Sequence, residues 1–193
     1  MTEKIQLKNN KVLEIILDEN PINPREDDNL TTMICSHKRY TLGDKHDYNT
    51  DNYDNWDEFE NAIRIKEKPV IMLPLYMYDH SGITISTTPF GCQWDSGQIG
   101  FVIITHKSID ALGCFINDGE SFTDYNERLT KYLIAEVELY DMYLTGETYG
   151  FRIVDAEDNE LDSCWGFYGS DWKTNGILDH IAEEDIPENI LRS

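Results

Sequence analysis

The sequence has little positive charge. Lys and Arg total 16 against 37 Asp and Glu, so the formal net charge of the 193 residues is -21 at pH 7. A surface of this sign repels nucleic acid and anionic membranes, so direct binding of either is not expected. It favours cationic partners, such as a basic protein or the basic groove of a nucleic-acid-handling enzyme. Alternatively, the charge serves only to keep the protein soluble.

The sequence also lacks long apolar runs. None is long enough to span a membrane, and the first residues, MTEKIQLKNNK, have no apolar core of the kind found in signal peptides. We therefore expect a cytoplasmic protein without a membrane partner. The cysteines form no CxxC pair, and in that compartment they are expected to be reduced thiols.

Several motifs with known chemistry are missing. No two histidines have HxH or HxxxH spacing, and the acidic run AEDNE is too short for an EF-hand and lacks its glycine. No Gly-rich phosphate loop, GxSxG or dinucleotide-binding fingerprint occurs. The sequence therefore predicts neither a metal site nor a cofactor.

Short apolar, β-branched runs predict strands, and one helix is predicted at 54–66. In that helix Trp56, Phe59 and Ile63 recur at helical spacing, and Asp54 is available as the N-cap. Pro74 falls inside a predicted strand and favours an edge or a bulge there. The predicted strands are 12–17, 30–35, 70–78, 83–86, 98–105, 149–154 and 161–168.

The strongest helix signal covers 121–145. Ser121 is placed as its N-cap and Gly146 as its C-terminal stop. Its apolar face comprises Leu129, Tyr132, Leu133, Val137, Tyr140 and Leu144. The order of elements predicts one α+β domain, in which an antiparallel sheet is packed by this long amphipathic helix, with shorter helices beside it. The acidic end of the chain, 182–193, is predicted to be an exposed tail.

Two polar turns hold a candidate catalytic group. If the strands that carry them are neighbours, His80, Cys92 and Asp95 converge. A thiol nucleophile, a histidine base and an orienting carboxylate would suit a small hydrolase or transferase. Alternatively, the polar side chains in both turns only bond local backbone amides, with Trp94 as a core anchor.

Acidic residues off the apolar faces are candidates for partner binding. Rows of carboxylates on a rigid body can imitate the phosphates of DNA, which carries one charge per roughly 1.7 Å of axis. Such a surface would compete for a basic groove, with an affinity that falls as salt rises. The candidates are Asp51, Asp54, Asp57, Glu58 and Glu60 near the first helix, and Glu136, Glu138 and Asp141 on the long one.

Four blocks of the sequence form a recognisable series: PLYMYDHSG (74–82), PFGCQWDSGQIGF (89–101), VELYDMYLTGETYGF (137–151) and DSCWGFYG (162–169). In this order they resemble a family of small acidic proteins, mostly uncharacterised, from phages, plasmids and other mobile elements of Gram-positive bacteria. They place the family core at 69–172 and leave 1–68 as a candidate variable part. The resemblance implies a bacterial host cell and a setting in which anti-CRISPR and anti-restriction proteins are common.

From this setting and the charge we expect a non-enzymatic inhibitor of a host defence nuclease. An RNA-guided nuclease of the Cas9 type is the first candidate, bound at or near its basic nucleic-acid channel. The alternatives are the small hydrolase or transferase described above, and an acidic interaction module that serves replication or partition of the mobile element.

Overall fold

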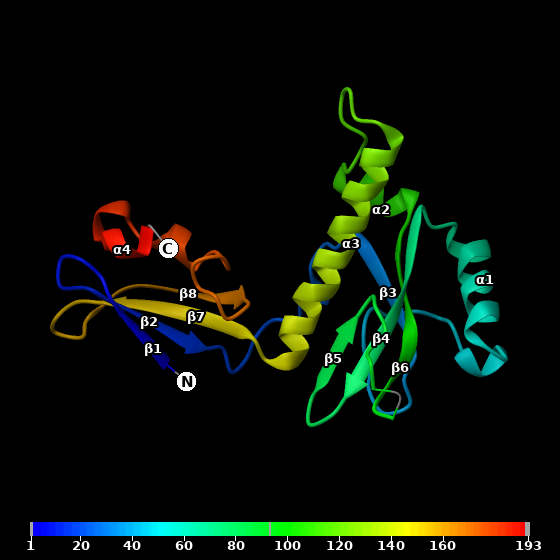
Figure 1. Ribbon diagram of the computed structural model, residues 1–193, viewed down its shortest axis with the longest axis horizontal. Coiled ribbons are helices and arrows are strands. Elements are labelled where there is room, and N and C mark those ends of the chain that lie inside the picture. Colours follow the sequence, from blue (N-terminus) through cyan, green and yellow to red (C-terminus); the bar gives the residue numbers. More distant parts are fainter. Residues whose placement is uncertain (1, 93, 192–193) are drawn as a thin grey trace. The chain divides into compact units, whose positions relative to one another are not determined.

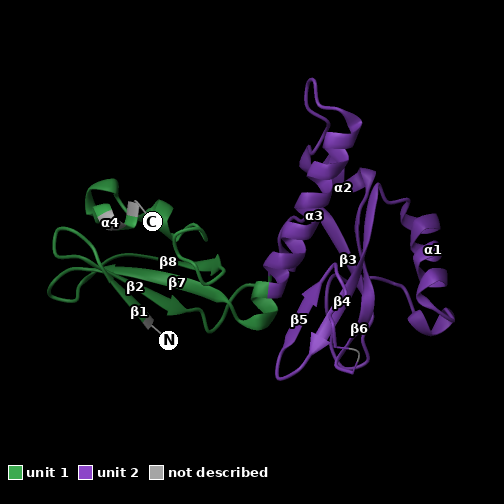
Figure 2. Cartoon of the chain, viewed as in Figure 1, with its two compact units in different colours: residues 1–23, 142–193 green, residues 24–141 purple. Residues whose placement is uncertain are grey.

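The structure is a computed structural model that describes residues 2–92 and 94–191. The chain divides into two compact units, one of Met1–Asn23 with Met142–Ser193 and the other of Pro24–Asp141 (Figure 2). The sequence suggested one domain with an N-terminal part ending near residue 68. The observed division differs because the first strands pair with strands near the end of the chain, a long-range contact that local sequence patterns do not reveal.

Unit 1, which comprises 1–23 and 142–193, is built on one antiparallel sheet with strand order β1-β2-β7-β8. The strands are β1 (Thr2–Gln6), β2 (Val12–Leu17), β7 (Thr148–Val154) and β8 (Glu160–Tyr168). After β8 come η3 (Ile177–His180), η4 (Glu183–Asp185) and α4 (Glu188–Leu191). Apolar side chains from the sheet and from this last segment form a single core.

The predicted exposed tail, 182–193, is contradicted in part. Glu183, Glu184 and Glu188 are exposed, but Ile186 is buried in the core of unit 1. The carboxylate of Asp185 is also buried, and it accepts hydrogen bonds from Lys11 Nζ at 2.5 Å and Asn9 Nδ2 at 2.8 Å. The acidic composition of the segment gave no sign that these two residues anchor it to unit 1.

Unit 2, residues 24–141, holds a second antiparallel sheet with strand order β3-β6-β4-β5. Figure 1 shows helices on both faces of this sheet, with α1 on one face and α3 on the other. The strands are β3 (Thr31–Cys35), β4 (Ile71–Asp79), β5 (Ile83–Ser86) and β6 (Ser96–Ile104). The helices are η1 (Pro24–Glu26), η2 (Thr50–Asn52), α1 (Trp56–Glu67), α2 (His106–Leu112) and α3 (Phe122–Thr145), the last of which ends in residues assigned to unit 1.

The α+β class and the antiparallel pairing are thus as predicted, but two four-stranded sheets replace the single sheet. The bulge that Pro74 suggested is present, since the β4–β6 register shifts between Leu75 and Tyr76. The strand β5 pairs with β4 only from Tyr76 onward. Pro74 therefore lies in a part of β4 that pairs with β6 alone.

The helix ends follow the sequence closely, with one exception. Ser121 Oγ accepts from the Asp124 amide at 3.1 Å, and Gly146 stops α3 with φ of 76°. The N-cap of α1 is Asn55 and not Asp54, because the Asn55 side chain accepts from the Glu58 amide at 2.9 Å.

The apolar face of α3 is mostly as predicted. Leu129, Leu133, Val137 and Tyr140 are buried. The prediction that Tyr132 belongs to this packed face is wrong, because its side chain is 44% exposed. It lies at the border of the buried stripe, where helical spacing alone does not separate packed from solvated positions.

Candidate functional site

Four hollows on unit 2 are linked by shared lining residues and are together called the Trp56 surface. The first, the α1–β4 pocket, is lined by Trp56, Asp57, Glu60, Met72, Pro74, Tyr76, Gln98 and Phe101. Gln98 also lines the second hollow, which includes Asp79, Trp94 and Asp95. Trp56 lines the remaining two, one beside Asp54 and one beside Asp51. Trp56 thus lines three of the four hollows.

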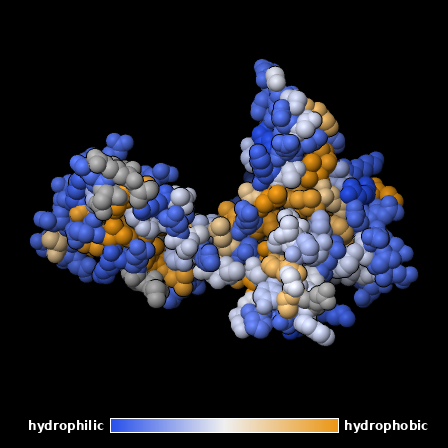
Figure 3. Space-filling model, viewed as in Figure 1, coloured by the Kyte–Doolittle hydropathy of each residue, from blue (hydrophilic) through white to orange (hydrophobic). Residues whose placement is uncertain are grey.

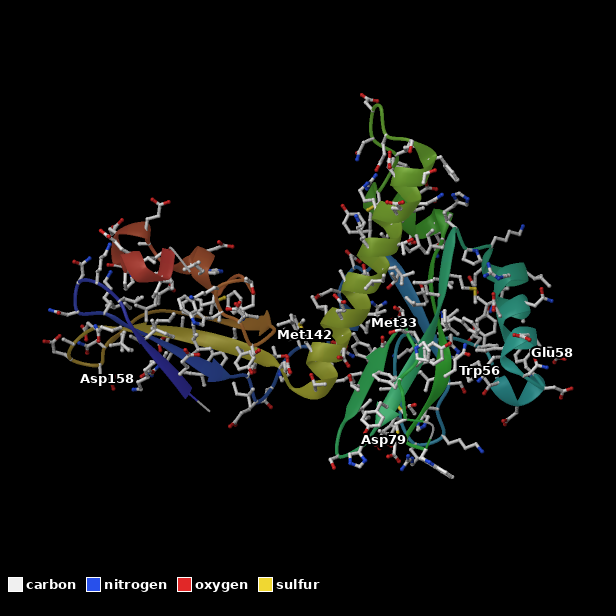
Figure 4. The ribbon with its side chains drawn as sticks, in the orientation of Figure 1. Met33, Trp56, Glu58, Asp79, Met142 and Asp158 are labelled. Carbon is white, nitrogen blue, oxygen red and sulfur yellow. The ribbon has the colours of Figure 1, made fainter. Side chains whose placement is uncertain are left out.

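The acidic residues predicted near the first helix border this surface. Asp51, Asp54 and Asp57 are exposed, and none of their carboxylates makes a hydrogen bond or ion pair with the residues that the structure describes. Figure 4 shows Trp56 on the side of α1 that faces the sheet and Glu58 on the side that points away. Figure 3 shows a mostly hydrophilic surface over α1, at the right of the view. Acidic residues at the N-terminus of α1 also stabilise the helix through its dipole.

Two of the predicted acids have hydrogen-bond partners on or next to α1 itself. Glu58 Oε2 accepts from the Asp54 amide at 3.0 Å, just before α1 begins. Glu60 Oε1 accepts from Arg64 Nε at 2.7 Å, one turn further along the same helix. The carboxylates of this group that remain available are therefore those of Asp51, Asp54 and Asp57, with Glu60 partly engaged.

Two of the three acids predicted as partner-binding sites on the long helix make hydrogen bonds within the fold. Glu136 accepts hydrogen bonds from the amides of Leu30 at 2.8 Å and Thr31 at 3.1 Å. Asp141 accepts from the Ile85 amide and the Thr84 hydroxyl, each at 2.7 Å. Both acids reach from α3 to backbone donors of unit 2, so they hold the fold together. Of these three acids, Glu138 alone is exposed, as a partner-binding residue requires.

The candidate catalytic residues are brought together, but in the wrong order for a nucleophile. Asp95 Oδ2 lies 3.2 Å from His80 Nδ1 and 3.9 Å from Cys92 Sγ. The carboxylate therefore stands between the thiol and the imidazole, whereas a cysteine nucleophile needs its histidine base beside the sulfur. The His80 and Asp95 side chains are 63% and 41% exposed, so no enclosed site excludes water from them. This geometry favours the turn-capping interpretation.

Trp94 corrects the sequence analysis most clearly. The predicted core anchor is 95% exposed and lines the second hollow of the Trp56 surface. It lies on the turn that precedes β6, outside the strands of the sheet. Sequence reasoning also missed the pocket role of Tyr76 and Gln98. The alternation of β4 and β6 does put these two on the α1 face, but only the pairing of the strands brings them together.

Among residues 2–92 and 94–191, no group of three or more His, Cys, Asp or Glu is placed to hold a metal ion. None of the helices in the same described ranges has both the length and the apolarity needed to cross a membrane. Comparison with known proteins finds no similarity: no family model, curated protein or solved structure matches this chain.

Proposed function

We propose that this protein is a non-enzymatic acidic inhibitor that binds a basic face of a nucleic-acid-handling host protein. The observation that carries the proposal is the presence of three exposed, unpaired carboxylates, those of Asp51, Asp54 and Asp57, and of the exposed Trp94 on the hollows of unit 2, which Lys38 and Arg39 also line. A Cas9-type nuclease is the first candidate partner, bound at or near its nucleic-acid channel. The four blocks that resemble proteins of mobile elements support this counter-defence setting.

Charge and aromatic contact would play different parts in such binding. A net charge of -21 attracts a basic partner over long distances and raises the rate of encounter. Once the partner has docked, exposed aromatic side chains supply most of the contact energy, because Trp and Tyr are enriched at binding hot spots. The Trp56 surface offers both, with Asp51, Asp54 and Asp57 at its border and Trp56 and Trp94 in its hollows.

The test is capture of proteins from a bacterial host lysate, followed by a cleavage assay with the captured nuclease. Capture is compared at ionic strengths of about 0.01 M and about 1 M, where charges are screened beyond about 30 Å and about 3 Å. We expect a basic nuclease that is captured at low salt, released at high salt, and inhibited by the purified protein. Capture of a basic protein without inhibition would favour the interaction-module alternative.

A matched pair of variants separates the site from the overall charge. D51N/D54N/D57N removes three exposed acids at the Trp56 surface, and D110N/D118N/E127Q removes three exposed acids elsewhere on unit 2. We expect the first variant to lose most of the captured partner and the second to retain it. Equal losses would mean that net charge alone accounts for the binding, and the site assignment would then be wrong.

A further inference from the structure

The α1–β4 pocket is a small hollow with aromatic walls and acidic sides. Its volume is about 170 Å³, and Trp56, Tyr76 and Phe101 contribute rings to its lining. Pockets for drug-sized ligands span about 300–1,000 Å³, so this one is too small for such a ligand and suits a single side chain. We propose that it receives one arginine side chain of a protein partner, which deepens and rests on the function proposed above.

The aromatic walls are held by packing on the sheet. The Trp56 ring lies 6.1 Å from that of Phe101 at an interplanar angle of 71°, an edge-on contact. Phe101 is 3% exposed and lies in the core between α1 and the sheet, so it fixes the floor of the pocket. Trp56 and Tyr76 are only partly buried, which leaves ring surface open to an occupant. A guanidinium stacks favourably on such rings when it lies within about 6 Å of their centroids.

The acidic sides supply the charge that a cation requires. Asp57 and Glu60 line the same pocket, one turn apart on α1. Glu60 already accepts from Arg64 through Oε1, so this carboxylate can bond a guanidinium, and its second oxygen, Oε2, is not used in that contact. Arginine fits better than lysine, because its planar fork both stacks on aromatic rings and bonds carboxylates at two points. None of the residues that line the pocket carries a positive charge.

The direct test uses the full chain and N-acetyl-arginine methylamide as the probe. Its binding is followed by the indole N–H signal of Trp56 in NMR spectra, which a W56F variant assigns. We expect a saturable shift with this probe and none with the neutral norleucine analogue. A shift that never saturates, or stronger binding of the lysine analogue, would overturn the assignment of an arginine site.

Two double variants provide a matched comparison. D57N/E60Q removes two charges inside the pocket, and D51N/D54N removes two charges at the same end of α1 but outside it. We expect affinity for the arginine probe to fall about tenfold or more in the first and less than about twofold in the second. Equal losses would show that the probe senses only the general acidic field, and the pocket proposal would fail.

A third variant tests the site without removing its acids. Q98R places a guanidinium on β6 beside the pocket, where it can occupy the space itself. We expect Q98R to abolish the response to the probe while the protein stays folded; an unchanged response would contradict the proposal. Because the probe assay needs no host protein, its failure is separable from failure of nuclease capture. A pocket that binds arginine in a protein that captures no nuclease would refute only the proposed function.

Discussion

Arg25 Nη2 donates to Asp44 Oδ2 at 2.6 Å, and this pair lies at the centre of a partly buried polar network in unit 2. The Arg25 side chain is 3% exposed. Its other terminal nitrogen lies 3.3 Å from Glu136 Oε2, so one cation joins a loop, η1 and the long helix. This network explains why an acid on α3 that looks like a surface residue in the sequence belongs to the fold.

Replacing Arg25 with Met should destabilise unit 2 strongly. The change leaves the carboxylates of Asp44 and Glu136 without their shared cation, and removal of one partner of a buried ion pair costs about 3–5 kcal/mol. The measurement is the free energy of unfolding from a urea titration. R64M is the control, because its pair with Glu60 is exposed and such helix pairs contribute only about 0.3–0.5 kcal/mol. Similar losses in both variants would contradict the structural role of Arg25.

The acids Glu136 and Glu138 offer a comparison within a single helix. Glu136→Gln keeps the shape of the side chain but weakens the acceptor for two amides of unit 2, so we expect a loss of about 1–3 kcal/mol in unfolding free energy. The Glu138 side chain is exposed, so Glu138→Gln should change the free energy of unfolding by less than about 0.5 kcal/mol. If partner capture falls in E138Q but not in E136Q, then Glu138 keeps the binding role that the sequence suggested.

The sequence predicted local features well because they depend on nearby residues. The caps of α3, the neighbouring strands predicted at 70–78 and 83–86, and the bulge after Pro74 all follow from short-range rules. The same rules failed where a distant partner decides the outcome. Burial of the 182–193 segment depends on strands near the N-terminus, and the roles of Glu136 and Asp141 depend on backbone donors far away in the sequence. Trp94 was misplaced because an aromatic residue is assigned to the core by its type alone.

Unit 1 should lose stability in acid through two buried carboxylates. Hydrogen bonds from Lys4 and Arg152 lower the pKa of Glu14, and those from Lys11 and Asn9 lower the pKa of Asp185. Each pKa in the folded state lies below that of the unfolded chain. Their stabilising effect is therefore complete above the unfolded values of about 4, and it disappears as the pH falls through the folded values.

The measurement is hydrogen exchange of the β2 and β7 amides between neutral and strongly acidic pH, which reports on unit 1 alone. An E14Q/D185N variant should be less stable than the parent protein at neutral pH, and it should lose less stability as the pH falls. A parent and a variant with the same pH dependence would show that other groups control the acid transition.

Thiol labelling should separate the cysteines by burial. Burial raises the pKa of Cys35 to about 12, while Cys92, Cys114 and Cys164 are only partly buried. The thiolate is the reactive form, so we expect iodoacetamide to label the other three well before Cys35 in the folded protein. Mass spectrometry of digested samples gives the order. Labelling of Cys92 far ahead of Cys114 and Cys164 would instead revive the hydrolase or transferase alternative.

Trp94→Ala should separate binding from folding. The side chain is 95% exposed, so its removal should change the free energy of unfolding by less than about 0.5 kcal/mol. If Trp94 anchors a partner, the same change should weaken capture by about 2 kcal/mol or more, roughly thirtyfold, as truncation of an interface tryptophan does.

The control is W165A. The Trp165 ring lies in unit 1 and covers Gly150 on the neighbouring strand. Its loss should lower stability without changing capture by the folded protein. Unchanged capture in W94A would remove Trp94 from the binding surface, and the contact would then have to come from Trp56 and its pocket.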